Sequence, residues 1–217
     1  MNKNRYTHVF WDWNGTIIDD LKINFFVINT LLSSRKKDAV SLSEYRHIFT
    51  FPIKEFYGRV GLPIYGEEYE KLVRDYWALY KSKAQDIPLM FGVLDVLNKL
   101  EQKQIKQYIL SASDRDMVFA QMSAHGVQNF FEDVIAPQDG YALGKIELAK
   151  QWMSKHNISP SSIIMIGDTF HDFETAKAIG IDCVLIDMGH QDLTKIPTNY
   201  DVMIYNDINI AAKELFV

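Results

Sequence analysis

The chain has 217 residues, of which 47% are hydrophobic, 13% aromatic and 24% charged. This balance is typical of a globular protein with a substantial core and excludes a disordered chain. The formal net charge of −5 excludes a broad basic surface, so we expect no nucleic-acid partner and no membrane partner. The length fits one large α/β domain, or a core domain that carries a smaller inserted one.

The sequence carries no sign of a targeting segment or a membrane span. Residues 1–8 are polar, and no run approaches 18 apolar residues. We therefore expect a soluble, cytoplasmic protein. The single cysteine, Cys183, excludes an intramolecular disulfide and a multi-cysteine zinc site. It lies in an apolar run, and we interpret it as a core residue.

In chain order, the first predicted element is a strand over residues 8–12, within the stretch Phe10-Trp-Asp-Trp-Asn-Gly-Thr16. This stretch places Asp12 at the carboxyl end of a buried strand and follows it with a tight loop. Open α/β sheets bind their ligands at that edge. Asp12 is therefore a candidate functional residue.

The next interval, residues 21–86, has no convincing strand run. Its apolar residues recur at helical spacing, as in Leu21, Phe25, Ile28 and Leu32. The interval therefore predicts a helical insertion after the first strand. Residues 61–66 predict a turn inside it, and residues 87–92 mark the return to the core.

The rest of the chain alternates short apolar runs with helical patterns. The runs are rich in β-branched residues and do not alternate cleanly, which is typical of strands buried on both faces. This order predicts a parallel sheet with right-handed crossovers. The predicted strands cover residues 107–111, 133–136, 162–167, 182–187 and 201–205.

Polar residues follow several of these predicted strands. Ser111 ends one strand, and its hydroxyl can bind a phosphoryl oxygen. Asp168 follows the run Ile163 to Ile166, and Asp172 comes four residues later. Carboxylates at neighbouring strand ends make a hard, oxygen-rich site suited to Mg²⁺. Lys145, at a predicted helix start, supplies the positive charge that such a site needs.

These pieces in this order resemble the four motifs of the haloacid dehalogenase superfamily over essentially the whole chain. The resemblance implies a Rossmann-like parallel sheet core, residues 1–18 and 87–217, with an inserted helical cap, residues 19–86, as in phosphoglycolate phosphatase-like members. It implies catalytic roles for Asp12, Asn14 and Lys145. It also implies phosphate binding by Ser111, Ala112 and Lys145, and Mg²⁺ binding by Asp12, the carbonyl of Asn14, Asp168 and Asp172.

The implied activity is Mg²⁺-dependent hydrolysis of a small phosphomonoester through an aspartyl phosphate on Asp12. Position 14 departs from the phosphatase pattern, which usually has a second Asp there for proton transfer. Asn14 cannot exchange a proton, and such assistance is worth about 10² to 10⁴-fold. The alternatives are therefore a phosphotransferase or mutase, or a catalytically weakened phosphometabolite-binding protein. On this interpretation Asn14→Asp should speed turnover. A dehalogenase fits less well, because it would leave Asp168 and Asp172 without a purpose.

Other residues are candidates for supporting roles. His171 and His190 are able to titrate near neutral pH at the rim of the site, although such histidines are more often solvated loop residues. Lys54 and Arg59 in the insertion are candidates to bind a substrate carboxylate or phosphate. The expected partner is a small phosphorylated metabolite, the insertion should set its choice, and the protein should be a monomer or dimer.

Overall fold

The computed structural model describes residues 5–138 and 144–216, and these residues form a six-stranded sheet in which all strands are parallel. The strand order is β3-β2-β1-β4-β5-β6. Each predicted strand run overlaps one observed strand, so the α/β fold class with a parallel sheet is confirmed. The strands are β1 (His8–Trp11), β2 (Lys106–Leu110), β3 (Asp133–Ile135), β4 (Ile163–Gly167), β5 (Asp182–Ile186) and β6 (Met203–Tyr205).

Helices cover both faces of the sheet. Successive side chains of a strand point to opposite faces, so each buried strand contributes to both core clusters. On β1, Val9 and Trp11 pack into one core cluster together with α5 (Val93–Gln102), α6 (Arg115–His125) and α9 (Ile208–Phe216). Phe10 packs into the other cluster with α7 (Lys145–Lys155) and α8 (Phe170–Ile179). Cys183 is a free, buried thiol in this second cluster, as expected.

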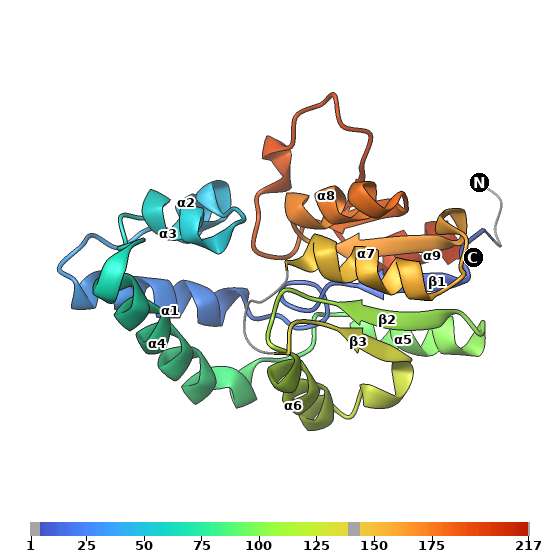
Figure 1. Ribbon diagram of the computed structural model, residues 1–217, viewed down its shortest axis with the longest axis horizontal. Helices are drawn as coiled ribbons and strands as arrows, with labels where there is room; N and C mark the ends of the chain where they lie inside the picture. The colour runs from blue at the N-terminus through green and yellow to red at the C-terminus, as the bar shows by residue number, and fades with distance from the viewer. Residues whose placement is uncertain (1–4, 139–143, 217) are drawn as a thin grey trace.

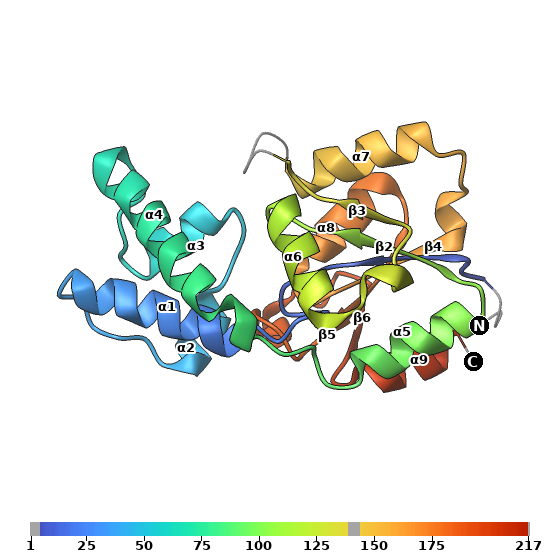
Figure 2. The ribbon, with the colours of Figure 1, turned by 90° about the horizontal axis from the view of Figure 1, so that it is seen from below.

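Four α-helices lie between β1 and α5 in the chain, and we call them the cap helices. Figures 1 and 2 show them grouped apart from the sheet and its covering helices. They pack on one another through buried residues such as Leu31, Phe56 and Leu72. They lie within the segment 19–86, and its treatment as a separate domain stays a prediction. The cap helices are α1 (Leu21–Ser34), α2 (Leu42–Ile48), α3 (Ile53–Arg59) and α4 (Gly66–Lys83).

The sheet topology determines which strand ends lie side by side. Strand β1 lies between β2 and β4, with Trp11 opposite Ile109 on one side and Ile166 on the other. The Asp12 amide donates to the Ile166 carbonyl at 2.9 Å, so β1 and β4 end at the same edge. Within the described ranges, no helix is both long enough and apolar enough to span a membrane.

Candidate active site

Four of the residues selected from the sequence meet at this edge of the sheet. The Lys145 amine lies 2.5 Å from a carboxylate oxygen of Asp12 and 2.5 Å from one of Asp172. Oxygen atoms of Asp12, Asp168 and Asp172 all lie within 4.8 Å of one another. All four side chains are buried, with Asp168 completely shielded from solvent. Residues that are up to 160 positions apart in sequence are thus joined by strand order alone.

The phosphate-binding candidates lie at the end of the neighbouring strand. Ser111 follows β2 and is buried, and its hydroxyl oxygen accepts a hydrogen bond from the Ser113 amide at 3.0 Å. Its hydroxyl proton therefore remains available for another acceptor. Ser111 and Ala112 line the same cavity as Asp12 and Lys145.

The carboxylates carry more negative charge than Lys145 offsets. Burial raises the pKa of Asp12 well above its ordinary range, and the nearby Asp172 and Asp168 raise it further, although Lys145 lowers it. Burial also raises the pKa of Asp168 to about 6. Asp172 behaves differently, because Lys145 and the Thr169 hydrogen bonds lower its pKa despite burial. A further cation beside these carboxylates would lower the pKa values of Asp12 and Asp168.

The donor set fits a divalent metal ion such as Mg²⁺. Three carboxylates face one lysine, and carboxylate oxygens are the ligands that Mg²⁺ prefers. A bound divalent ion would offset the remaining negative charge. Asp172 is the most constrained of the three, because one oxygen contacts Lys145 and the other accepts from the Thr169 amide and hydroxyl at 2.9 and 2.7 Å.

The side chain of Asn14 is fully engaged by neighbouring protein groups. Its amide nitrogen donates to Asp20 at 2.7 Å and to the Tyr80 hydroxyl at 3.1 Å. Its amide oxygen accepts from the Ser113 hydroxyl at 2.5 Å. An amide has two N–H donors, and both are used here. Asn14 therefore has a fixed orientation and no free proton donor.

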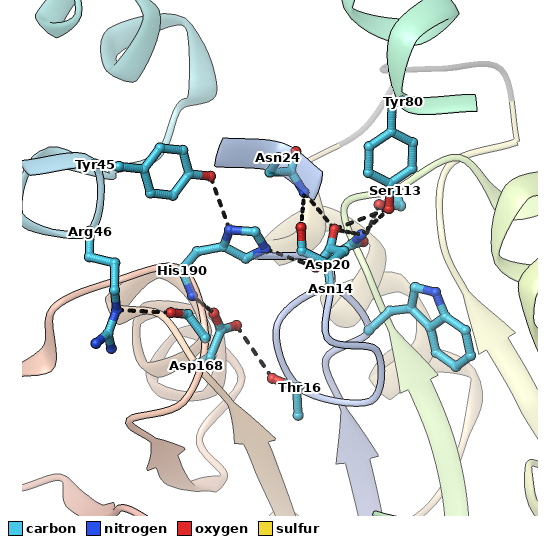
Figure 3. Close-up of polar contacts among 12 residues, drawn as sticks. Asn14, Thr16, Asp20, Asn24, Tyr45, Arg46, Tyr80, Ser113, Asp168 and His190 are labelled. Carbon is cyan, nitrogen blue, oxygen red and sulfur yellow. Dashed lines mark hydrogen bonds and ion pairs between the residues drawn. The ribbon is translucent and has the colours of Figure 1, made fainter. Parts of the chain in front are cut away.

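Asp20 is the centre of a buried polar network that sequence reasoning did not identify (Figure 3). It has no exposed surface, and it accepts from Asn14, Asn24, Tyr80 and His190. We call these five residues the Asp20 network. The network joins the loop after β1 to cap helices α1 and α4 and to the loop after β5.

His190 is the cationic member of the Asp20 network. Its Nε2 atom lies 2.9 Å from Asp20, and its Nδ1 atom lies 3.0 Å from the Tyr45 hydroxyl. Burial alone would lower its pKa, but Asp20 raises the pKa of His190 to about 9. Despite burial, His190 and the hydrogen bonds from Asn14 and Tyr80 keep the pKa of Asp20 below its ordinary value. The His190 backbone amide also donates to Asp168 at 2.6 Å.

One sequence signal could have identified Asp20. It stands directly before α1, where an aspartate usually caps the helix with its side chain. Here the Asp20 side chain makes no such capping bond and points into the network instead. Nothing in the sequence near His190 marks it as the partner, because the two residues are separated by 170 positions.

The other supporting candidates lie in different places. His171 lines the cavity and stacks on Phe51, with ring centroids 4.9 Å apart. Lys54 instead lies over the rings of Tyr65 and Tyr69, and Arg59 pairs with the neighbouring Glu55 at 3.8 Å. Neither Lys54 nor Arg59 lines the cavity. The structure therefore does not support the expectation that they bind the substrate.

The comparison with protein families identifies the chain. The model of the haloacid dehalogenase-like hydrolases matches residues 9–186. The chain belongs to this family. The predicted family and its enzyme class, a hydrolase of the phosphatase type, are thereby confirmed.

Known proteins with similar sequences or folds agree with this assignment. A phosphoglycolate phosphatase from Synechococcus elongatus is 22% identical over 184 residues, which cover 85% of each chain. A tyrosine-protein kinase, PtkA, from Mycobacterium tuberculosis is 25% identical over 66% of this chain, but the match spans only 49% of that protein. The crystal structure of a predicted phosphatase from Clostridium acetobutylicum has the same fold, with a TM-score of 0.82 at 18% identity over 97% of this chain and 98% of that one.

Proposed function

We propose that this hydrolase is a Mg²⁺-dependent phosphatase of small phosphomonoesters in which Asp12 is the nucleophile. One observation carries the proposal: Asp12 ends the central strand, contacts Lys145, and lies within 4.8 Å of Asp168 and Asp172. Phosphoryl transfer needs an in-line nucleophile surrounded by compensating charge. The relative named as a phosphoglycolate phosphatase supports the reaction class.

Different residues at the sheet edge would perform the nucleophilic attack and the binding of the phosphoryl group. The Asp12 carboxylate attacks phosphorus, and an aspartyl phosphate forms as the bond to the leaving oxygen breaks. Lys145 holds Asp12 and, once charge develops on the phosphoryl oxygens, also stabilises them. Ser111 donates its hydroxyl proton, and Ala112 its backbone N–H, to the same oxygens. Bound Mg²⁺ supplies the positive charge that neutralises the phosphoryl group and the carboxylates; Asp12, the Asn14 carbonyl, Asp168 and Asp172 would hold it.

Asn14 makes proton transfer the slow part of this reaction. An amide is neither an acid nor a base near neutral pH, and both N–H groups of Asn14 are engaged, so Asn14 neither protonates the leaving alkoxide nor activates water. An aryl oxide leaves without a proton and should be tolerated better than an alkoxide. Water should also attack the aspartyl phosphate slowly.

Transfer of the phosphoryl group to an alcohol is the second candidate function. The engaged amide of Asn14 favours it, because slow hydrolysis leaves time for another acceptor. The relative named as a tyrosine-protein kinase adds support at the level of phosphoryl transfer. Product analysis with and without an added alcohol distinguishes the two functions.

The test of the proposed function is hydrolysis of an aryl phosphate with and without Mg²⁺. We expect Mg²⁺-dependent release of phosphate that is lost in Asp12→Asn, because an amide lacks the attacking carboxylate oxygen. Thermal unfolding gives a readout that does not depend on turnover. Mg²⁺ should raise the melting temperature of the native protein and raise it much less in Asp168→Asn. Full activity of Asp12→Asn would remove Asp12 from the mechanism.

A further inference from the structure

The cavity that contains Asp12 continues into the cap helices, and its character changes along the way. It encloses about 660 Å³, within the range of small-molecule sites. Its catalytic end is polar, with Asp12, Lys145 and Asp168. The part formed by the cap helices and the loops between them is mainly aromatic and aliphatic. That part is lined by Ile28, Tyr45, Phe49, Phe51, Pro52, Ile53, Phe56, Tyr57, Tyr76, Trp77 and Tyr80.

Positive charge is confined to the catalytic end and to His190. Among the described residues that line the cavity, Lys145 is the one lysine, and none is an arginine. Lys145 is already held between Asp12 and Asp172. His190 is committed to Asp20. A carboxylate or second phosphate on the leaving group would therefore reach the apolar part of the cavity without a cationic partner, at a large desolvation cost.

Three tyrosine hydroxyl groups around this part of the cavity contact other buried side chains of the protein. Tyr45 contacts His190, Tyr76 donates to Asn24, and Tyr80 donates to Asp20. These bonds use the polar end of each tyrosine and leave the ring as the surface that lines the cavity. A leaving group with several hydroxyls would lose its water shell and find few replacements.

We propose that the substrate is a phosphomonoester whose leaving group is apolar, with an aromatic ring, and carries no second anionic group. This substrate class rests on the proposed phosphatase function. The aromatic ring would pack among the cap rings, which favour edge-to-face and offset contacts. The phosphoryl group would lie at Asp12, beside Lys145, at the catalytic end of the cavity.

The test compares phosphates whose leaving groups are all alkyl alcohols. This choice prevents a chemically reactive aryl ester from imitating specificity. The compounds are 2-phenylethyl phosphate, glycerol 3-phosphate and phosphoglycolate, assayed by phosphate release with Mg²⁺. We expect kcat/KM for 2-phenylethyl phosphate to exceed both others by roughly ten- to a hundredfold, the worth of burying a phenyl ring.

A positive charge introduced into the apolar part should weaken the preference for an apolar leaving group. Ile53 lines the cavity, whereas its neighbour Lys54 lies over Tyr65 outside it. We expect Ile53→Lys to raise kcat/KM for phosphoglycolate relative to 2-phenylethyl phosphate by about tenfold or more. The matched control, Lys54→Gln, should leave that ratio unchanged. A loss of phosphoglycolate activity in Lys54→Gln would instead indicate that Lys54 binds the substrate, and it would overturn the proposal.

Acetyl phosphate separates failure of the substrate class from failure of the proposed function. Its small leaving group needs nothing from the cap helices. If acetyl phosphate is hydrolysed with dependence on Asp12 but phosphoglycolate or glycerol 3-phosphate is preferred to 2-phenylethyl phosphate, the substrate class is wrong and the phosphatase stands. If none of the four compounds is hydrolysed with dependence on Asp12, the proposed function fails and the substrate class fails with it.

Discussion

At the scale of single residues, the contacts of Asn14 change what its replacement should do. From the sequence alone, Asn14 stands where a phosphatase usually has an acid, which predicts that an aspartate there restores proton transfer. In the structure, the Asn14 amide nitrogen lies 2.7 Å from the Asp20 carboxylate. A carboxylate at position 14 would lie beside the buried Asp20 carboxylate and repel it. The two groups would then have to share a proton.

We therefore predict that Asn14→Asp destabilises the protein and gives little catalytic gain. The free energy of unfolding should fall by roughly 1–3 kcal/mol, because two buried hydrogen bonds are replaced by a repulsive contact. The value of kcat on 2-phenylethyl phosphate should rise by less than tenfold. Urea unfolding and steady-state kinetics measure both quantities.

Asn98→Asp is the matched control for this change. The Asn98 side chain makes one hydrogen bond, to the Leu94 carbonyl within helix α5, and this bond is exposed to solvent. Its replacement should cost much less stability. A stable Asn14→Asp protein that turns over alkyl phosphates tenfold faster would show that Asp20 does not oppose the new group.

Residue contacts of this kind mark the limit of what the sequence predicts here. Asp12, Ser111, Lys145 and Asp168 could be selected because each directly follows a strand or begins a helix, and strand order then brings them together. The Asp20 and His190 contact has no such signal. It depends on how the loop after β5 packs against α1. The sequence of the loop and the sequence of the helix do not specify that contact.

At the scale of elements, α2 is joined to the loop after β5. The Arg46 side chain on α2 pairs with Asp187 at 2.5 Å and donates to the carbonyls of Gly189 and Gln191 at 3.1 and 3.0 Å. Its own carbonyl accepts from the Asp192 amide at 3.0 Å. These contacts hold a cap helix against the loop that carries His190.

We predict that Arg46→Ala weakens substrate binding more than it slows chemistry. Loss of the three side-chain bonds should loosen α2 from the loop and raise KM for 2-phenylethyl phosphate by about tenfold. The kcat value should change much less. Steady-state kinetics over a range of substrate concentrations separates the two parameters.

Arg35→Ala is the control for Arg46→Ala. Arg35 pairs with Asp75 at 3.1 Å and thereby joins α1 to α4 within the cap helices, without contacting the loop after β5. We expect its KM to stay close to that of the native protein. An equal rise in KM for both variants would mean that general loosening of the cap helices, and not the contact of α2 with the loop, controls binding.

The elements themselves were predictable to a greater degree than their contacts. Buried parallel strands are short, β-branched and apolar on both faces, so β4 and β5 are evident from composition alone. The cap helices show helical spacing in α1 and α4. The positions of Lys54 and Arg59 could not be foreseen, since helical spacing does not say which polar side chains face a cavity.

At the scale of the whole molecule, one cavity connects the sheet edge to the cap helices. The strand ends and the first turns of α7 and α8 supply the carboxylates and Lys145, and the cap helices supply a mainly apolar surface. Family membership and the phosphatase relatives agree with the chemistry of the sheet edge. The account therefore depends most on one claim, that Asp12 takes up the phosphoryl group.

Acid quenching during turnover tests that claim most directly, because slow hydrolysis should let the phosphorylated enzyme accumulate. The native protein is mixed with acetyl phosphate and Mg²⁺, quenched, digested and examined by mass spectrometry. We predict a single added phosphoryl group on the peptide that contains Asp12, and none in Asp12→Asn. Turnover without a phosphorylated Asp12, or with the phosphoryl group on another residue, would contradict the account.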